Sequence, residues 1–262
     1  MFQTIKALVL REVKYRDADK LLTVLSAEAG KLTVTARGAL RKRCPFAAAA
    51  QILCYSEMML VEAGGKWLIR EAEPIEQFLP LREELEKLAL GCYFAEVLET
   101  VGDADSVNPE LLRLGLNSLY ALGMEKYAPE HIKAAFELRA VCMAGFLPLL
   151  DGPDEFFSLT GGRVHGAGQF PGSPGQSLPL DEASCAAMRY IVSAPLKRLF
   201  SFAIPRESEA RLRRVCEAYL CEKLERNFGT LRYWQNVRGP QGASNPAKRT
   251  NFGQTEPDYG SL

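Results

Sequence analysis

The spacing of apolar residues changes at Pro80, and this change limits the chain to a fold with two unlike parts. Before it, short runs rich in Val, Ile and Leu alternate with polar residues, a period of two that is typical of half-buried strands. After it, apolar residues recur at intervals of three and four, as in Leu81, Leu85 and Leu88, which is typical of an amphipathic helix. We therefore predict an α+β protein with a β domain at 1–80 and a helical domain at 81–235.

The β domain is expected to be a small closed barrel. Hairpin signals at Glu28-Ala29-Gly30 and at Gly64-Gly65 divide it into short strands, with no long helix between them. A flat open sheet would leave unpaired edges, so we predict a barrel of the oligonucleotide-binding (OB) type. The strand before Arg37 carries Thr33 and Thr35 on the same face as that arginine.

The helical part contains two helix-start signals, an irregular segment and a polar end. Asn108-Pro109 and Ala128-Pro129 each place a proline in the first turn of a helix. Residues 151–180 are dense in Gly and Pro, which predicts an irregular insert. Residues 236–262 contain few aliphatic residues, and we expect them to form a disordered tail.

Cysteine usage and apolar runs bear on the cellular compartment. The seven cysteines are odd in number and scattered, which favours free thiols in a reducing cytosol over a disulfide framework. The N-terminal segment has no small-residue cleavage site and is expected to be a strand. No run reaches the roughly 18 apolar residues of a membrane helix. We expect a cytoplasmic protein that does not contact a membrane.

The zero formal net charge conceals an uneven distribution. Residues 1–50 carry ten Lys and Arg against four Asp and Glu, whereas residues 81–150 carry six against eleven. Residues 51–80 are acidic as well, with two cations against five carboxylates. A polyanion is therefore expected to bind the first domain.

The densest cationic segment is "TARGALRKRC", and its cations are the first candidates for contact with nucleic-acid phosphates. Nucleic-acid binding needs cations that follow the phosphates and planar groups on which bases stack. The alternative is a solvated loop, and the segment alone does not distinguish DNA from RNA or from an acidic protein. The primary candidates are Arg37, Arg41, Lys42 and Arg43, followed by Lys14, Arg16, Lys20, Lys66 and Arg70, with Tyr15, Phe46, Tyr55 and Trp67 as aromatic candidates.

Motifs for bond-breaking chemistry are missing from the sequence. There is no nucleophile elbow, Walker loop or HExxH motif, and the chain has only two histidines, His131 and His165. Asp17 and Asp19 fit a turn better than a metal site or an acid–base pair. We therefore expect no enzymatic activity.

A second candidate surface lies in the helical domain. Leucines at 111–119 exceed what one helix face must bury, and Arg113, Lys133 and Arg139 interrupt an acidic background. Such a surface would bind an acidic, apolar peptide tail. The alternative, that these residues form core and ordinary surface, is the more common outcome for such a pattern.

The segment "ALVLREVKYRDADKLLTVLSAEAGKLTVTARGALRKR" resembles the opening of the RecO family of bacterial recombination mediators. The helical middle and "YIVSAPLKRLFSF" extend the resemblance over residues 2–235. It implies an OB barrel, a helical domain and, in many members, a zinc module. It also implies binding of single- and double-stranded DNA, annealing of complementary strands, and loading of RecA with RecR onto DNA coated by the single-strand-binding protein. That protein's acidic tail is the partner implied for the helical surface, and the nucleoid is the implied location.

The chain departs from the family at the zinc module. Family members with zinc carry two Cys-x-x-Cys pairs where this chain has "DGPDEFF" and "QFPGSPGQS". A structural zinc site needs four ligands, and only Cys142, His165 and Cys185 lie in or near the module. We expect a degenerate zinc-finger-like module without metal, and no cofactor.

Two other functions remain compatible with the sequence. The first is a protein-interaction adaptor whose contact with DNA is incidental. The second is an RNA-binding OB protein, because no residue pattern here reads the 2′-hydroxyl.

Overall fold

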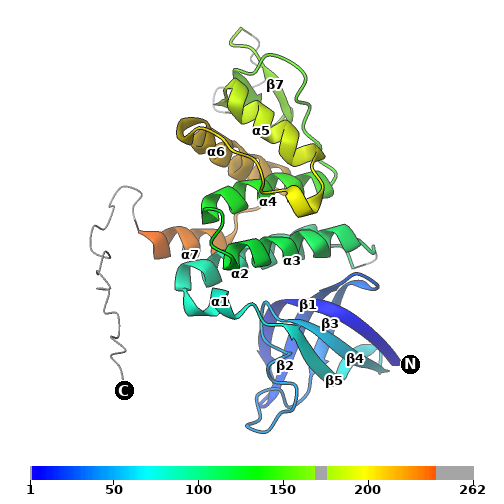
Figure 1. Ribbon diagram of the computed structural model, residues 1–262. Helices are drawn as coiled ribbons and strands as arrows, with labels where there is room; N and C mark the ends of the chain where they lie inside the picture. Colours follow the sequence, from blue (N-terminus) through cyan, green and yellow to red (C-terminus); the bar gives the residue numbers. More distant parts are fainter. Residues whose placement is uncertain (1, 105, 169–175, 240–262) are drawn as a thin grey trace, which may run out of the picture.

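The computed structural model describes residues 2–104, 106–168 and 176–239. A β-barrel lies at one end and a group of helices at the other, with a small sheet beyond the helices (Figure 1). The expected α+β class is confirmed. The strands of the first part end at Glu76, and the first helix begins at Leu79.

The barrel contains β1 (Phe2–Tyr15), β2 (Asp19–Ser26), β3 (Gly30–Ala36), β4 (Tyr55–Ala63) and β5 (Lys66–Glu76). The strands close in the order β1-β2-β3-β5-β4, and only the β3–β5 pair is parallel. This OB-like closure confirms the predicted barrel and leaves its sheet with no free edge.

The alternation seen in the sequence fills the barrel interior. Val9, Val24, Val34, Met58 and Ile69 are buried in one core cluster. The connection at 37–54 covers part of this core, because Phe46, Ala49 and Ala50 belong to the same cluster.

The helical part contains seven α-helices and one short 3-10 helix among the described residues. They are α1 (Leu79–Glu83), α2 (Leu85–Val101), α3 (Pro109–Gly123), α4 (Pro129–Met143), α5 (Glu182–Ser193), η1 (Leu196–Arg198), α6 (Arg206–Lys223) and α7 (Gly229–Arg238). Asn108 caps α3 by accepting a hydrogen bond from Leu111 N at 3.1 Å, as its sequence signal predicts. Helix α4 is buried along 131–138 and packs against α2, α3, α5 and α6.

The barrel and the helices share one core. Leu8, Leu10 and Leu25 project from β1 and β2 into the same buried cluster as α2 and α3. Gly115 of α3 lies at this junction, where a Cβ would come within 2.6 Å of Leu98 Cδ1 on α2 and 3.6 Å of Leu8 Cδ2 on β1, so the missing side chain lets α3 pack closely against both. Because this contact is apolar and tightly packed, it holds the two parts in one orientation.

The Gly- and Pro-rich segment contains a small sheet of β6 (Phe156–Ser158), β7 (Arg163–His165) and β8 (Ser177–Pro179), in the order β7-β6-β8. The Phe157 ring meets Tyr219 of α6 edge-on, with centroids 4.9 Å apart. The predicted insert is therefore partly regular, and residues 169–175 lie outside the described residues.

Helix α7 continues to Arg238, past the point where the sequence predicts the tail to begin. The reason is that Arg238 forms ion pairs with Glu86, at 2.9 Å, and with Glu130. The rest of the predicted tail, 240–262, lies outside the described residues.

Candidate nucleic-acid interface

The tip of the β1–β2 hairpin carries three of the candidate cations. Lys14 pairs with Lys20 across the hairpin. Lys14 and Arg16 are exposed, and the Arg16 guanidinium lies 5.2 Å from the centroid of the Tyr15 ring. Lys20 differs, because its Nζ donates to Glu12 Oε2 at 2.8 Å. Its charge is therefore largely compensated within the protein.

The turn that follows β3 is anchored to this hairpin. Gly38 N donates to Asp19 Oδ1 at 2.7 Å, and Leu40 N donates to Ala18 O at 2.9 Å. The buried side chains of Ala39 and Phe46 pack into the barrel core and so attach this connection to the barrel. The backbone of the cationic turn is thus fixed beside the β1–β2 tip.

Four cations project from this anchored turn. Arg37, Arg41, Lys42 and Arg43 are exposed, and none of them forms an ion pair within the described part of the chain. The four are adjacent to Lys14 and Arg16 through the hydrogen bonds that join the two turns. The fold therefore gathers six cations at one end of the barrel, and none of the six forms an ion pair with another described residue.

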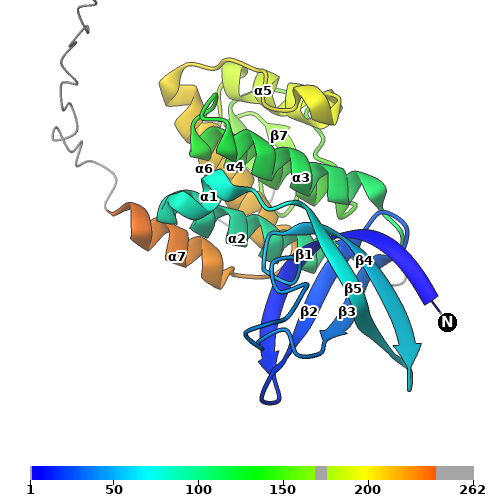
Figure 2. The same ribbon diagram turned by 60° about the horizontal axis from the view of Figure 1, so that its bottom comes forward.

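A groove of about 310 Å³ runs between the β1–β2 tip and the β4–β5 tip. It is lined by Tyr15, Thr33, Thr35, Lys66 and Trp67, with Leu21 and Gly65. The parallel pairing of Val34 with Trp67 brings β5 beside β3 and so completes the groove. Figure 2 shows both tips pointing away from the helices. In OB barrels, the β2–β3 face and these two loops bind oligonucleotides.

The other aromatic and cationic candidates occupy different places. Trp67 is half-buried, packing against the barrel core while it lines the groove. Phe46 is a core residue, and Tyr55 packs against the helices. Arg70 is exposed on β5 but does not line the groove, and the next residue is Glu71. Lys31 joins the two domains by donating to Glu99 O at 2.8 Å.

Lys133, a candidate for peptide binding, is an interior residue. It is 4% exposed, and its Nζ lies 2.7 Å from Glu137 Oε1 and 2.6 Å from Glu217 Oε2. Burial alone would lower the pKa of Lys133, but the two carboxylates outweigh it and raise that pKa. The expectation that Lys133 contacts a peptide at the surface is wrong, because its side chain is buried and its ammonium group already pairs with Glu137 and Glu217.

The buried carboxyl group beside Lys133 is strongly perturbed. Burial raises the pKa of Glu137 to about 7, although Lys133 opposes the shift. Glu137 Oε1 accepts a hydrogen bond from Tyr93 Oη at 2.6 Å, while Oε2 has no hydrogen-bond partner. This cluster joins α2, α4 and α6 inside the helical domain.

The other two peptide-binding candidates have separate environments. Arg139 is partly buried and donates to Ala194 O at the end of α5. Arg113 is exposed on α3 and pairs with Glu110 one turn earlier. The structure does not gather the three candidates into one cationic surface.

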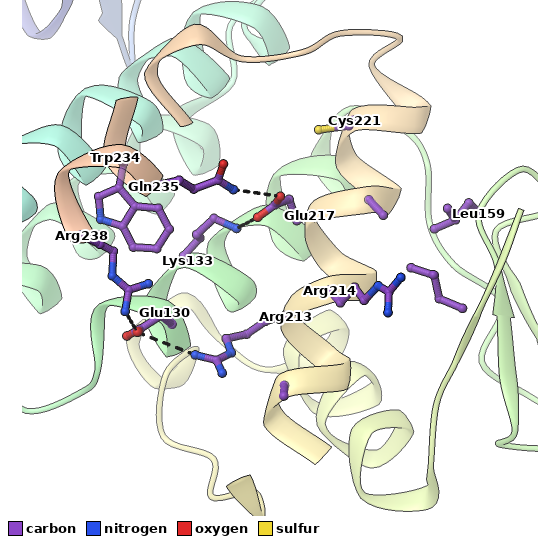
Figure 3. A pocket seen from close by; sticks show the side chains of 13 residues that line it. Glu130, Lys133, Leu159, Arg213, Arg214, Glu217, Cys221, Trp234, Gln235 and Arg238 are labelled. Carbon is purple, nitrogen blue, oxygen red and sulfur yellow. Dashed lines mark hydrogen bonds and ion pairs between the residues drawn. The ribbon is translucent and has the colours of Figure 1, made fainter. Parts of the chain in front are cut away.

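A cleft of about 690 Å³ opens beside Lys133, between α4, α6 and α7 (Figure 3). Its lining includes Arg213, Arg214, Trp234 and Arg238, with apolar side chains such as Leu159. Glu130 accepts from Arg238 and lies 3.8 Å from Arg213. Arg214 is exposed and has no ion-pair partner among the residues that the structure describes. Arg213 and Arg214 are neighbours in the sequence, but the cleft forms only when α7 packs beside α6 and supplies Trp234 and Arg238 to its lining.

The two histidines are structural in their contacts. His165 Nε2 lies 2.9 Å from Ser177 Oγ, and His131 stacks on Phe202 with ring centroids 4.1 Å apart. Within the described ranges, no three His, Cys, Asp or Glu residues are grouped closely enough to hold a metal ion. The absence of a zinc site and of a cofactor stays a prediction. No helix among the described elements is both long and apolar enough to span a bilayer.

Comparison with known proteins decides the family. The model of the recombination protein O N-terminal domain matches residues 1–78, and the model of its C-terminal domain matches residues 82–232. The chain belongs to the RecO family. The DNA repair protein RecO of Acetivibrio thermocellus is 28% identical over 233 residues, covering 86% of this chain and 92% of that protein. RecO of Symbiobacterium thermophilum is 27% identical over 253 residues, covering 89% and 97%. The chain is thus a DNA repair protein of the RecO family.

Proposed function

We propose that this protein is a recombination mediator that binds DNA through the basic end of the barrel. It binds and anneals single-stranded DNA and, with RecR, helps RecA to load onto DNA coated by the single-strand-binding protein, at the nucleoid in the cytoplasm. The observation that carries the proposal is the anchored turn of uncompensated cations, Arg37 and 41–43, beside a groove that contains Tyr15 and Trp67.

The mechanism is electrostatic. The exposed cations displace counterions from the phosphates, and the groove offers Tyr15 and Trp67 to unstacked bases. Annealing follows because neutralised strands can approach each other. None of these steps makes or breaks a covalent bond, and the proposal includes no enzymatic activity.

The test replaces Arg41, Lys42 and Arg43 together with alanine. A matched control replaces Lys197, Arg206 and Arg232, which are also exposed and form no ion pair in the described part of the chain. We expect the first variant to lose about tenfold or more in affinity for single-stranded DNA and to lose annealing, and the control to keep both. Equal behaviour of the two variants would overturn the assignment.

The same assay separates the two alternative functions. An RNA-binding protein would prefer RNA over DNA of matched sequence. A protein-interaction adaptor would not anneal strands, and its partner binding would be insensitive to salt. We expect DNA binding that weakens steeply with salt.

For the acidic tail of the single-strand-binding protein, the cleft in Figure 3 is a better candidate site than Arg113 and Arg139, which do not line it, and Lys133 lines it with its charge held by Glu137 and Glu217. It combines apolar lining with the uncompensated Arg214. Charge reversal at Arg214 is expected to weaken binding of a synthetic acidic tail peptide, and charge reversal at Arg232 is the control. Unchanged binding in R214E would place the tail elsewhere.

A further inference from the structure

An apolar groove lies where β5 passes α3 and enters α1, a path visible in Figure 2. Two hollows of about 240 and about 200 Å³ adjoin here and share Glu76, Phe78 and Tyr120 in their linings. Leu81 and Leu119 complete the apolar floor. None of these residues belongs to the basic end of the barrel.

The groove is flanked by large apolar side chains that remain in water. Ile75, Leu79, Tyr120 and Met124 are each 49–58% exposed. Tyr120 of α3 and Met124, which caps the end of that helix, lie four residues apart and line the groove, while Ile75 and Leu79 adjoin its lining residues along the chain. A cluster of exposed apolar side chains beside a hollow is typical of an interaction site.

The floor of the groove is held in place by a strained residue. Phe78 has left-handed backbone angles, φ 48° and ψ 50°, which an L-residue with a bulky side chain rarely adopts. Its N donates to Glu76 Oε1 at 2.7 Å, and its ring is 6% exposed. The groove is therefore preformed, and one of its carboxylates is already oriented.

The charges around the groove are predominantly negative. Glu76 lines the groove and is exposed, and Glu73 on β5, Glu84 between α1 and α2, and Glu125 just after α3 are exposed as well. Lys87 is already shared between Glu84 and Glu125, at 2.7 Å from each. The hydrogen bond from Lys87 lowers the pKa of Glu125.

Two cations lie near this groove along the chain, and neither of them lines it. Arg82 of α1 donates to Ile52 O at 2.7 Å and to Gln77 O at 3.1 Å. Lys126 lies over the Tyr127 ring, 5.2 Å from its centroid. A groove that contains Glu76 and no cation in its lining disfavours both DNA and an acidic peptide.

We propose that this groove binds a partner protein through a basic amphipathic segment, with bulky apolar side chains in the groove and Lys or Arg facing the carboxylates. Charge complementarity with Glu76, which lines the groove, and with the exposed Glu73 on the same strand selects this chemistry over an acidic tail. The site is distinct from the basic end, so one molecule can hold DNA and this partner together.

The first experiment is a methyl-detected NMR titration of the full chain with a synthetic amphipathic helix of Leu and Lys. A matched peptide carries Glu in place of Lys. We expect saturable shifts of the methyl groups of Leu81, Leu119 and Met124, which line the groove, with the Lys peptide, and binding about tenfold weaker with the Glu peptide. Absence of these shifts, or equal shifts with both peptides, would overturn the proposal.

The second experiment uses surface variants that leave the core intact. Tyr120→Ala with Met124→Ala, and separately Glu73→Lys, should each weaken binding of the Lys peptide about tenfold. Glu182→Lys, on α5, is the control for charge reversal. DNA affinity should be unchanged in all of them, so failure here is distinguishable from failure of the DNA-binding assignment. Wild-type peptide affinity in both groove variants would refute the site.

Discussion

Arg41, Lys42 and Arg43 at the barrel end are exposed and form no ion pair within the described structure, whereas Lys133 in the helical domain is buried against two carboxylates. From the sequence, all four are candidate binding cations. The difference between them is the location of the nearest carboxylate. A cation is available to a ligand only where the fold leaves it uncompensated, so removing a charge should affect binding at one place and stability at the other.

The largest difference is expected in stability. Lys133→Met leaves Glu137 and Glu217 without their cation, which should lower the free energy of unfolding by roughly 3 kcal/mol. Arg41→Ala should change it by no more than about 0.5 kcal/mol. Urea unfolding of the two variants measures both values. Equal stabilities would mean that the Lys133 cluster contributes nothing.

The pH dependence of stability sharpens the contrast inside the helical domain. The pKa of Glu137 is about 7 in the folded protein, against 4.5 as its ordinary value, so the folded state retains a proton between these pH values. This carboxyl group therefore reduces stability as pH rises from about 4.5 to about 7, by roughly 3 kcal/mol at most.

Glu137→Gln removes that titration. The stability of the wild type relative to this variant should fall as pH rises through this interval, and urea unfolding at a series of pH values measures it. Other titrating groups cancel in the comparison. A difference that stays constant with pH would contradict the raised pKa.

The groove at the barrel end should distinguish single strands from duplex. Tyr15→Ala removes a ring that lines the groove, and we expect it to weaken binding of single-stranded DNA by about 1–3 kcal/mol. Duplex DNA, whose bases are already stacked, should bind almost as before. Fluorescence anisotropy with the two DNA forms measures this, and an equal loss for both would argue against stacking in the groove.

Arg113 lies between the two extremes, because it is exposed but paired with Glu110. Surface pairs of this kind contribute about 0.5 kcal/mol or less. Arg113→Ala should therefore change neither unfolding nor DNA binding measurably. A loss of DNA affinity in this variant would extend the interface beyond the barrel.

The sequence was sufficient where neighbours along the chain determine the outcome. Alternation predicted the barrel, and Asn108 predicted the start of α3, since each depends on local spacing. Lys133 was misplaced because Glu217 lies 84 residues away in sequence. For the same reason two hollows could not be predicted from the sequence. The groove beside Trp67 depends on the parallel pairing of β3 with β5, and the cleft beside Arg214 depends on the packing of α7.

The strain at Phe78 has no sequence signal, because it follows from how β5 meets α1. Thr33 and Thr35 could have been found as groove residues, since they share the outer face of β3. The excess of cations over carboxylates in residues 1–50 indicated that the charges at 41–43 would lack partners. The hydrogen bond from Gly38 to Asp19 that anchors this turn could not be predicted from the sequence.

The most direct test of the account is the salt dependence of single-stranded DNA binding. The slope of the logarithm of affinity against the logarithm of salt concentration counts the phosphates that the protein neutralises. Replacing Arg41, Lys42 and Arg43 with alanine should reduce that slope by about 2, if each cation contacts one phosphate of a single strand. A slope identical to the wild type would contradict the claim that the basic end of the barrel is the DNA-binding surface.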